Sequence, residues 1–207
     1  MSTKPGKIIE LDSKALRDKL SNLAKREGIH QWDLGAACSK DSSVQVDRGE
    51  AKQLKGAQRS SITVRVWNNK GLVGITSTSD LSDIGLEKAL IGAHQASDFG
   101  NANDIPAFSP LAKAPLPNLD RPLRPAQGIS RLLELLKQAE AELLSRHPAI
   151  QTVPYNALGE TNSERIYLNS DGALRQMKRT DACIYLYARA EEDWRKPRSA
   201  GAWFALL

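Results

Sequence analysis

Histidines are the first residues to consider for chemistry, because imidazole groups serve both as zinc ligands and as general bases near neutral pH. The chain contains His30, His94 and His147, each in a different segment. A zinc peptidase helix presents two histidines one turn apart beside a glutamate, so that metal and base act on one water molecule. No two histidines here have that spacing. The sequence predicts no metal-binding residue, and we expect His147 to lie at a helix C-terminus, where positive charge is favoured.

Motifs for nucleotide binding and nucleophilic catalysis are also missing from the sequence. It contains no GxGxxG, no Walker loop and no GxSxG elbow. The carboxylates of Glu191-Glu192-Asp193 could serve acid–base chemistry, but Trp194, Arg195 and Lys196 follow them directly, which is typical of a mixed-charge turn. We therefore predict no catalytic residue and no cofactor-binding residue.

Thiols and tyrosines are the remaining candidates. Cys38 and Cys183 form no CxxC pair, which predicts two reduced thiols in a cytosolic protein. Cys183 lies in an apolar strand pattern and is expected in the core, with Cys38 less firmly so. Tyr185 and Tyr187 share one strand face and could form a binding surface, although sheet packing is the commoner reason for such a pair.

Composition limits the classes of protein that are possible. The 207 residues carry 29 Lys and Arg against 24 Asp and Glu, a formal charge of +5, and are 41% hydrophobic and 26% charged. These values fit a soluble globular protein and exclude a disordered chain, a collagen-like fibre and a disulfide scaffold. No apolar run reaches the roughly 18–20 residues of a membrane span, and residues 1–7 lack the apolar core of a secretion signal. We expect a cytoplasmic protein that has no membrane partner.

The mild positive charge leaves nucleic-acid binding as an alternative. We expect the basic side chains to be dispersed over solvated surface, whereas clustering on one face would favour nucleic acid. The densest groups are Lys52, Lys55 and Arg59; Arg175, Lys178 and Arg179; and Arg195, Lys196 and Arg198.

Periodic apolar residues predict three helices, over about 12–27, 82–97 and 126–146. Asp12 or Ser13 can cap the first and Ser82 the second, while Gly28 and Pro148 prevent continuation of the first and third. Ile84, Ala89, Leu90 and Ala93 are expected on the inner side of the second helix.

Alternating residues predict strands between these helices. The expected segments are 31–39, 44–46, 62–66, 72–77, 152–157, 165–169, 173–178 and 182–190, with turns at 40–43, 68–71 and 169–172. The order suggests an α+β fold, with helices packed on antiparallel sheet and an internal duplication of a helix-plus-meander unit.

A proline-rich stretch predicts how the chain is divided. Six prolines between residues 98 and 125 argue against regular structure there, while Phe108, Leu111, Leu116 and Leu119 supply apolar anchors. We expect a first helix-meander-helix unit over 1–97, a connection over 98–125 and a second helix-meander unit over 126–207.

Two stretches resemble the N-terminal domain of the PmbA/TldD family, known also as modulators of DNA gyrase and as TldD–TldE metallopeptidases. The first runs from Val46-Asp47-Arg48-Gly49-Glu50 to a hairpin ending in Gly74-Ile75-Thr76-Ser77-Thr78-Ser79-Asp80-Leu81. The second comprises the Tyr185-Leu186-Tyr187 strand and Lys196-Pro197-Arg198-Ser199-Ala200-Gly201, which are more similar to the PmbA (TldE) branch. The resemblance extends from about residue 9 to 205.

The resemblance implies a role in a cytosolic zinc metallopeptidase system that degrades or matures peptides. TldD-type members carry an HExxxH zinc helix, which this sequence lacks, and PmbA-type members pair with a TldD-type subunit to enclose a chamber. The implied cofactor, zinc, would belong to a catalytic partner or to a missing region, so we expect no cofactor here and no activity from this chain alone. A TldD-like subunit or a second copy is the implied partner, and a peptide the implied substrate.

The apolar segment 200–207 leads to a further expectation, that the chain is the N-terminal portion of a longer protein or a short homologue that uses a partner. The resemblance would then leave the family's C-terminal domain outside this chain. The alternatives are a nucleic-acid-associated regulator and a stand-alone interaction domain that self-associates through this segment.

Overall fold

A computed structural model describes residues 11–100, 108–115 and 124–206. The elements in chain order are α1 (Ser13–Arg26), β1 (Gln31–Asp47), β2 (Glu50–Trp67), β3 (Val73–Thr78), α2 (Asp83–Ser97), the 3-10 turn η1 (Pro110–Ala112), α3 (Ile129–Ser145), β4 (Ile150–Asn169), β5 (Leu174–Ala190) and β6 (Arg198–Leu206).

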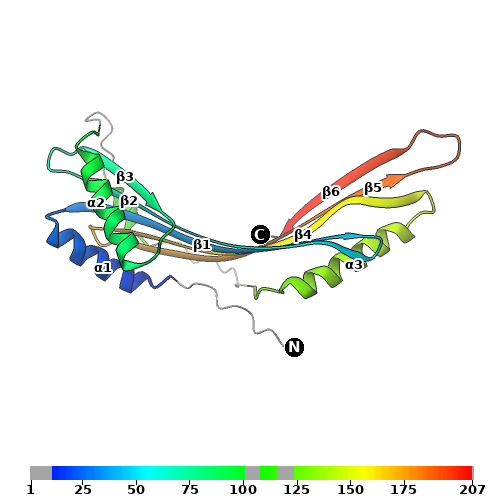
Figure 1. Ribbon diagram of the computed structural model, residues 1–207, viewed down its shortest axis with the longest axis horizontal. Coiled ribbons are helices and arrows are strands. Elements are labelled where there is room, and N and C mark those ends of the chain that lie inside the picture. The colour runs from blue at the N-terminus through cyan, green and yellow to red at the C-terminus, as the bar shows by residue number, and fades with distance from the viewer. Residues whose placement is uncertain (1–10, 101–107, 116–123, 207) are drawn as a thin grey trace.

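All the strands join one sheet of six strands in the order β3-β2-β1-β4-β5-β6, with every neighbouring pair antiparallel. The predicted α+β fold is confirmed. A helix followed by a three-strand meander occurs in both halves, α1-β1-β2-β3 and α3-β4-β5-β6, and the first strands of the two meanders pair with each other. The sheet is arched, with α1 and α3 on its outer side (Figure 1).

The strands are much longer than the sequence predicts. The expected turn at 40–43 is wrong, because β1 continues through it and pairs on one side with 55–58 and on the other with 159–162. Strands β4 and β5 likewise run without the predicted interruptions. Two flanking strands satisfy the backbone of Lys40-Asp41-Ser42-Ser43 on both sides, and this outweighs the turn preference of Ser and Asp.

The helices pack against one face of the sheet in two separate apolar clusters. The first lies under α1 and α2 and includes Leu20, Leu90, Leu34, Val64 and Leu168. The second lies under α3 and joins Leu132 and Leu136 to Val44, Val46 and Leu158. Even-numbered positions of β1, β2, β4 and β5 supply both clusters, so odd-numbered positions face the other way.

The helix ends follow local chemistry. Asp12 caps α1 by accepting from the amide of Ala15 at 2.9 Å, and Ser82 caps α2 by accepting from Gly85 at 3.2 Å. Helix α3 begins at Ile129, three residues later than the prediction, after Gly128 at a φ of 78°. Ile84 is a correction: it is 62% exposed, whereas Ala89, Leu90 and Ala93 are buried as expected.

Part of the proline-rich connection packs on the helix-free side of the sheet. The ring of Phe108 meets Trp67 edge-on at 5.1 Å, and the Arg175 guanidinium donates to the carbonyls of Leu111 and Ala114. Phe108 is therefore an anchor, but the Leu111 side chain is 74% exposed. Leu116 and Leu119 lie outside the described residues, and the division of the chain at 98–125 stays a prediction.

Contact between α2 and β3 requires a glycine at position 74. A Cβ atom there would lie 2.0 Å from the carbonyl oxygen of Ala93 and 2.3 Å from the amide nitrogen of Ser97. Gly35 is a natural control, because a Cβ atom at that position of β1 would have no neighbour within 4 Å.

We predict that Gly74→Ala lowers the free energy of unfolding by about 2 kcal/mol or more, because helix α2 must move away from β3. Gly35→Ala should leave stability unchanged or raise it by up to about 1 kcal/mol, since alanine restricts the unfolded chain. Urea denaturation followed by circular dichroism measures both variants. Equal stability of the two variants would contradict the tight α2–β3 contact.

Candidate functional site

We call the side of the sheet opposite α1, α2 and α3 the open face. It carries most of the sheet's side chains that are not packed in either apolar cluster. It is formed by odd-numbered residues of β1, β2, β4, β5 and β6, as the alternation of buried positions requires. In Figure 1 it is the side away from α1 and α3, between the two raised arms of the arch.

An aromatic cluster occupies the β4–β6 end of the open face. It consists of Tyr155, Tyr185, Tyr187 and Trp203, and Tyr185 lies directly opposite Trp203 in the β5–β6 pairing. The rings of Tyr155 and Tyr187 meet edge-on at 5.7 Å. Tyr155 and Trp203 remain 66% and 64% exposed. Tyr185 and Tyr187 are thus half-buried side chains of an exposed aromatic surface, rather than members of either apolar cluster.

Gly201 allows the tyrosines to pack over the edge strand. A Cβ atom at this position would come within 2.8 Å of the Tyr187 ring and 3.1 Å of the Tyr185 hydroxyl. Only a glycine leaves room for both rings, so the shape of the aromatic cluster depends on this residue.

A hollow of about 390 Å³ adjoins the aromatic cluster. Asp41, Arg179, Asp181, Cys183 and Trp203 are among the residues that line it. Its acidic groups are engaged, since Asp41 accepts from the Thr161 hydroxyl at 2.7 Å and Asp181 from Arg179. The hollow thus combines an aromatic wall with a charged floor, a composition suited to a peptide side chain.

At its other end the open face is closed by a buried polar network. Asp33 is 2% exposed and accepts two hydrogen bonds from the Arg65 guanidinium, one of them at 2.9 Å, and a third from Tyr167 at 3.2 Å. Burial raises the pKa of Tyr167, and the charge of Asp33 acts in the same direction. Hydrogen bonding to Asp33 raises the pKa of Arg65, which keeps the guanidinium charged. Asp33, Arg65 and Tyr167 are thus paired with one another, and we assign this network a structural role.

The two long edges of the sheet differ in chemistry. Within the described part of the chain, no strand pairs with the outer side of residues 50–61 in β2, and this segment carries Lys52, Lys55 and Arg59, charges of the kind that protect an edge against further pairing. Strand β6 carries no charged residue after Arg198, and both Trp203 and Phe204 are largely exposed. The β6 edge is therefore the one that is open to another extended segment.

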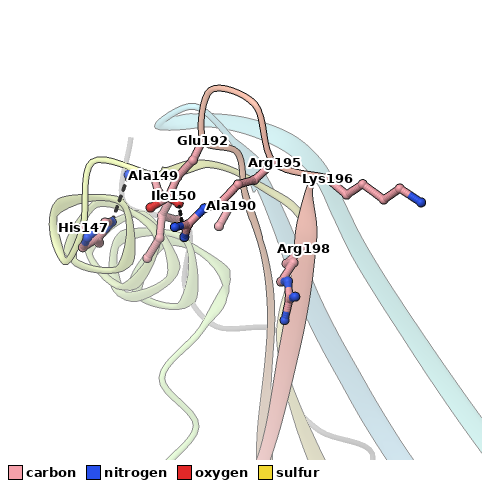
Figure 2. A pocket seen from close by; sticks show the side chains of 8 residues that line it. All are labelled: His147, Ala149, Ile150, Ala190, Glu192, Arg195, Lys196 and Arg198. Carbon is pink, nitrogen blue, oxygen red and sulfur yellow. Dashed lines mark hydrogen bonds and ion pairs between the residues drawn. The ribbon is translucent and has the colours of Figure 1, made fainter.

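A larger hollow, of about 850 Å³, lies where the β5–β6 turn meets the end of α3 (Figure 2). The three basic residues predicted as a group do not converge there: Arg195 pairs with Glu192, Lys196 points away and Arg198 lies along β6. His147 accepts from the Ala149 amide at 3.1 Å. The mixed-charge turn at 191–196 is confirmed, and it presents no converging set of groups for catalysis or anion binding.

The histidines stay apart in the structure. His30 is exposed after α1, His94 lies in the last turn of α2, and His147 follows the end of α3. Among the described residues, no three His, Cys, Asp or Glu side chains gather in a way that could hold a metal ion. The residues present therefore do not fit a zinc site, and we derive no step through zinc. None of the described helices is long and apolar enough to cross a membrane.

The core position predicted for the two cysteines is confirmed for Cys38 and wrong for Cys183. Cys38 is 4% exposed in the apolar cluster, whereas Cys183 is exposed on the open face. The apolar pattern around Cys183 belongs to its even-numbered neighbours Ile184 and Leu186, which pack towards α3. Burial raises the pKa of the Cys38 thiol, and the nearby Glu164 adds to this effect.

Comparison with protein families identifies this sheet. Residues 39–97 match the PmbA/TldA metallopeptidase domain 1, and residues 124–206 match the PmbA/TldA metallopeptidase central domain. The chain belongs to the PmbA/TldD family. The resemblance to this family in the sequence is thereby confirmed, while no curated protein matches the chain.

Solved structures show the same fold. A protein from Bacteroides thetaiotaomicron named as a modulator of DNA gyrase aligns with a TM-score of 0.75 and 17% identity, over 96% of this chain and 46% of its own. A modulator of a DNA gyrase from Thermotoga maritima gives 0.71 and 16%, over 93% and 42%. TldE from Thermococcus kodakarensis gives 0.70 and 16%, over 90% and 42%. The chain spans less than half the length of each of these PmbA/TldD-like structures.

We predict that a thiol reagent such as Ellman's reagent modifies Cys183 at least about tenfold faster than Cys38, which is buried and has a raised pKa. The Cys183→Ser variant should lose the fast phase, and Cys38→Ser should lose only the slow one. Fast labelling that persists in Cys183→Ser would contradict the placement of the two thiols.

Proposed function

We propose that this chain supplies a non-catalytic part of a PmbA/TldD-like zinc metallopeptidase system, in which it pairs with another subunit and lines the cavity that holds a peptide. The observation that carries the proposal is the open face, an arched sheet surface that ends in an unprotected edge strand and an exposed aromatic cluster. The two family matches support the metallopeptidase context.

The geometry suggests how an extended peptide would be held. A sheet edge offers backbone donors and acceptors to any extended chain, whatever its sequence. Trp203 on the edge strand and Tyr155 two strands further in, on β4, are both largely exposed and add apolar contact area. Binding of this kind would favour unfolded polypeptides, because a folded segment has already paired its own backbone groups.

The partner in this proposal is a TldD-type subunit, which would provide the zinc ligands and the chemistry of peptide cleavage. Similarity to TldE supports this choice, since it is the branch that the sequence resembles. The assembly would be an oligomer of the cytoplasm, where the reduced thiols Cys38 and Cys183 are expected.

Nucleic-acid regulation is the second candidate, because Arg59, Arg165 and Arg179 gather on one face after all. Two of these arginines are each paired with an aspartate, Asp41 or Asp181, and the three arginines fall well short of the roughly six to ten phosphate contacts that tight nucleic-acid binding uses. The peptide-holding role therefore has the stronger support.

Zinc-dependent cleavage of an unstructured peptide tests the proposal. We expect no cleavage by this chain alone, and cleavage when a TldD-type subunit of the same organism is added. A chelator should abolish that activity. Cleavage by the isolated chain, or activity that survives the chelator, would contradict the proposal.

Trp203→Ala tests the aromatic cluster within that complex. We expect KM for the peptide to rise by about five- to tenfold, because one exposed aromatic contact is lost while the subunits remain paired. Trp194→Ala is the matched control, since Trp194 is fully exposed in the β5–β6 turn away from the open face. Equal KM values for the two variants would contradict a role for the aromatic cluster.

A further inference from the structure

We propose that the open face selects acidic peptides, held by an arginine cluster made of Arg59, Arg165 and Arg179. This inference rests on the proposed function and adds the chemical class of the substrate. Pairing with an edge strand alone would not predict this preference, because backbone hydrogen bonds do not depend on the charge of the peptide's side chains.

The register of the sheet brings the three arginines together from three strands. Arg59 of β2 lies opposite Ser39 of β1, Ser39 opposite Ser163 of β4, and Ser163 opposite Arg179 of β5. These four residues form one row across the sheet. Arg165 lies two residues along β4 from Ser163, on the same face. The arginines therefore surround a floor of small side chains over which a ligand backbone can lie.

The spacing of the row suits an extended peptide. Three strand-to-strand steps separate the backbones of Arg59 and Arg179, which is roughly 14 Å. In an extended chain, residues i and i+4 point to the same side and lie roughly 13–14 Å apart. Two carboxylates at that separation can reach both guanidinium groups at once.

The cluster retains positive charge after its internal pairing. The Arg59–Asp41 distance is 3.7 Å and the Arg59 side chain stays 75% exposed, while Arg179 uses its Nε atom to bond Asp181. Arg165 is exposed, and it has no acidic partner among the residues that the structure describes. The three arginines thus exceed the two aspartates, and guanidinium groups bind carboxylates in bidentate geometry.

The hollows of the open face connect this cluster to the aromatic one. A hollow of about 480 Å³ includes Arg59, and the 390 Å³ hollow described above includes Arg179 and Trp203. The two share Asp41 and Ser43. A peptide that follows them crosses the open face from β2 towards β6, with acidic residues near β2 and β5, and the residues that come next in the peptide then reach Trp203 and the β6 edge.

Fluorescence anisotropy with three labelled peptides of equal length tests the preference. The peptides share one tryptophan and carry either glutamate, glutamine or lysine at positions i and i+4. We expect the glutamate peptide to bind the 207-residue chain most tightly and the lysine peptide most weakly, with the difference shrinking as salt is added.

The triple variant Arg59→Gln, Arg165→Gln and Arg179→Gln should weaken binding of the glutamate peptide roughly tenfold, because the two glutamates then lose every guanidinium group of the cluster. The control Lys14→Gln, Lys25→Gln and Lys88→Gln removes the same charge from exposed lysines on the helices α1 and α2 and should leave affinity unchanged. Thermal unfolding of both variants shows that the sheet is intact.

The outcomes separate this inference from the proposed function. If no peptide binds, the peptide-holding role itself is overturned. If all three peptides bind equally, or the two triple variants behave alike, only the acidic preference is overturned. Tighter binding of a single-stranded oligonucleotide of equal length than of the glutamate peptide would overturn the peptide as occupant of the open face.

Discussion

The antiparallel pairing of β1 with β4 is the interaction on which the rest of the structure depends. It runs without a break from the Asp33–Asn169 pair to the Val44–Leu158 pair and is the only place where the two meanders meet in the sheet order of the described residues. The apolar clusters lie at its two ends, while Lys40 and Ser42 occupy the helix-side positions between them. Backbone hydrogen bonds therefore hold the halves together along the middle of this junction, and each apolar cluster adds packing between the halves at one end, with Leu34 and Leu168 in the first and Val44 and Leu158 in the second.

Buried glutamates on the helix side complete this junction. Glu164 accepts from the amide of Leu11, just before α1, and Glu160 accepts from that of Gln127, just before α3. Glu140 of α3 accepts from the amides of Arg48 and Gly49 at the β1–β2 turn. Each carboxylate accepts from one or two backbone amides at a helix start or a turn. These glutamates on the helix side of the sheet therefore fix where α1 and α3 begin and where the β1–β2 hairpin turns.

Local signals in the sequence were sufficient for the three helices and for the turns at 68–71 and 169–172, but not for the length of the strands. The caps Asp12 and Ser82 and the turn at 169–172 depend on neighbours a few residues away, and all are found where predicted. The continuation of β1 through residues 40–43 depends on pairing with β4, about 120 residues later in the chain. The sequence predicts only an apolar segment where β6 lies, because the extended conformation of β6 depends on its pairing with β5.

The same limit explains why the candidate site could not be found from the sequence. Arg59, Arg165 and Arg179 are far apart in the chain, and only the combined register of three strand pairs places them on one face. Arginines over a floor of serines cannot form a core, so this face of the sheet can gain little by folding on itself. Its opposite face has exhausted its acidic groups on backbone amides. The arginines of the open face therefore lie on the side of the arch where a ligand can reach them.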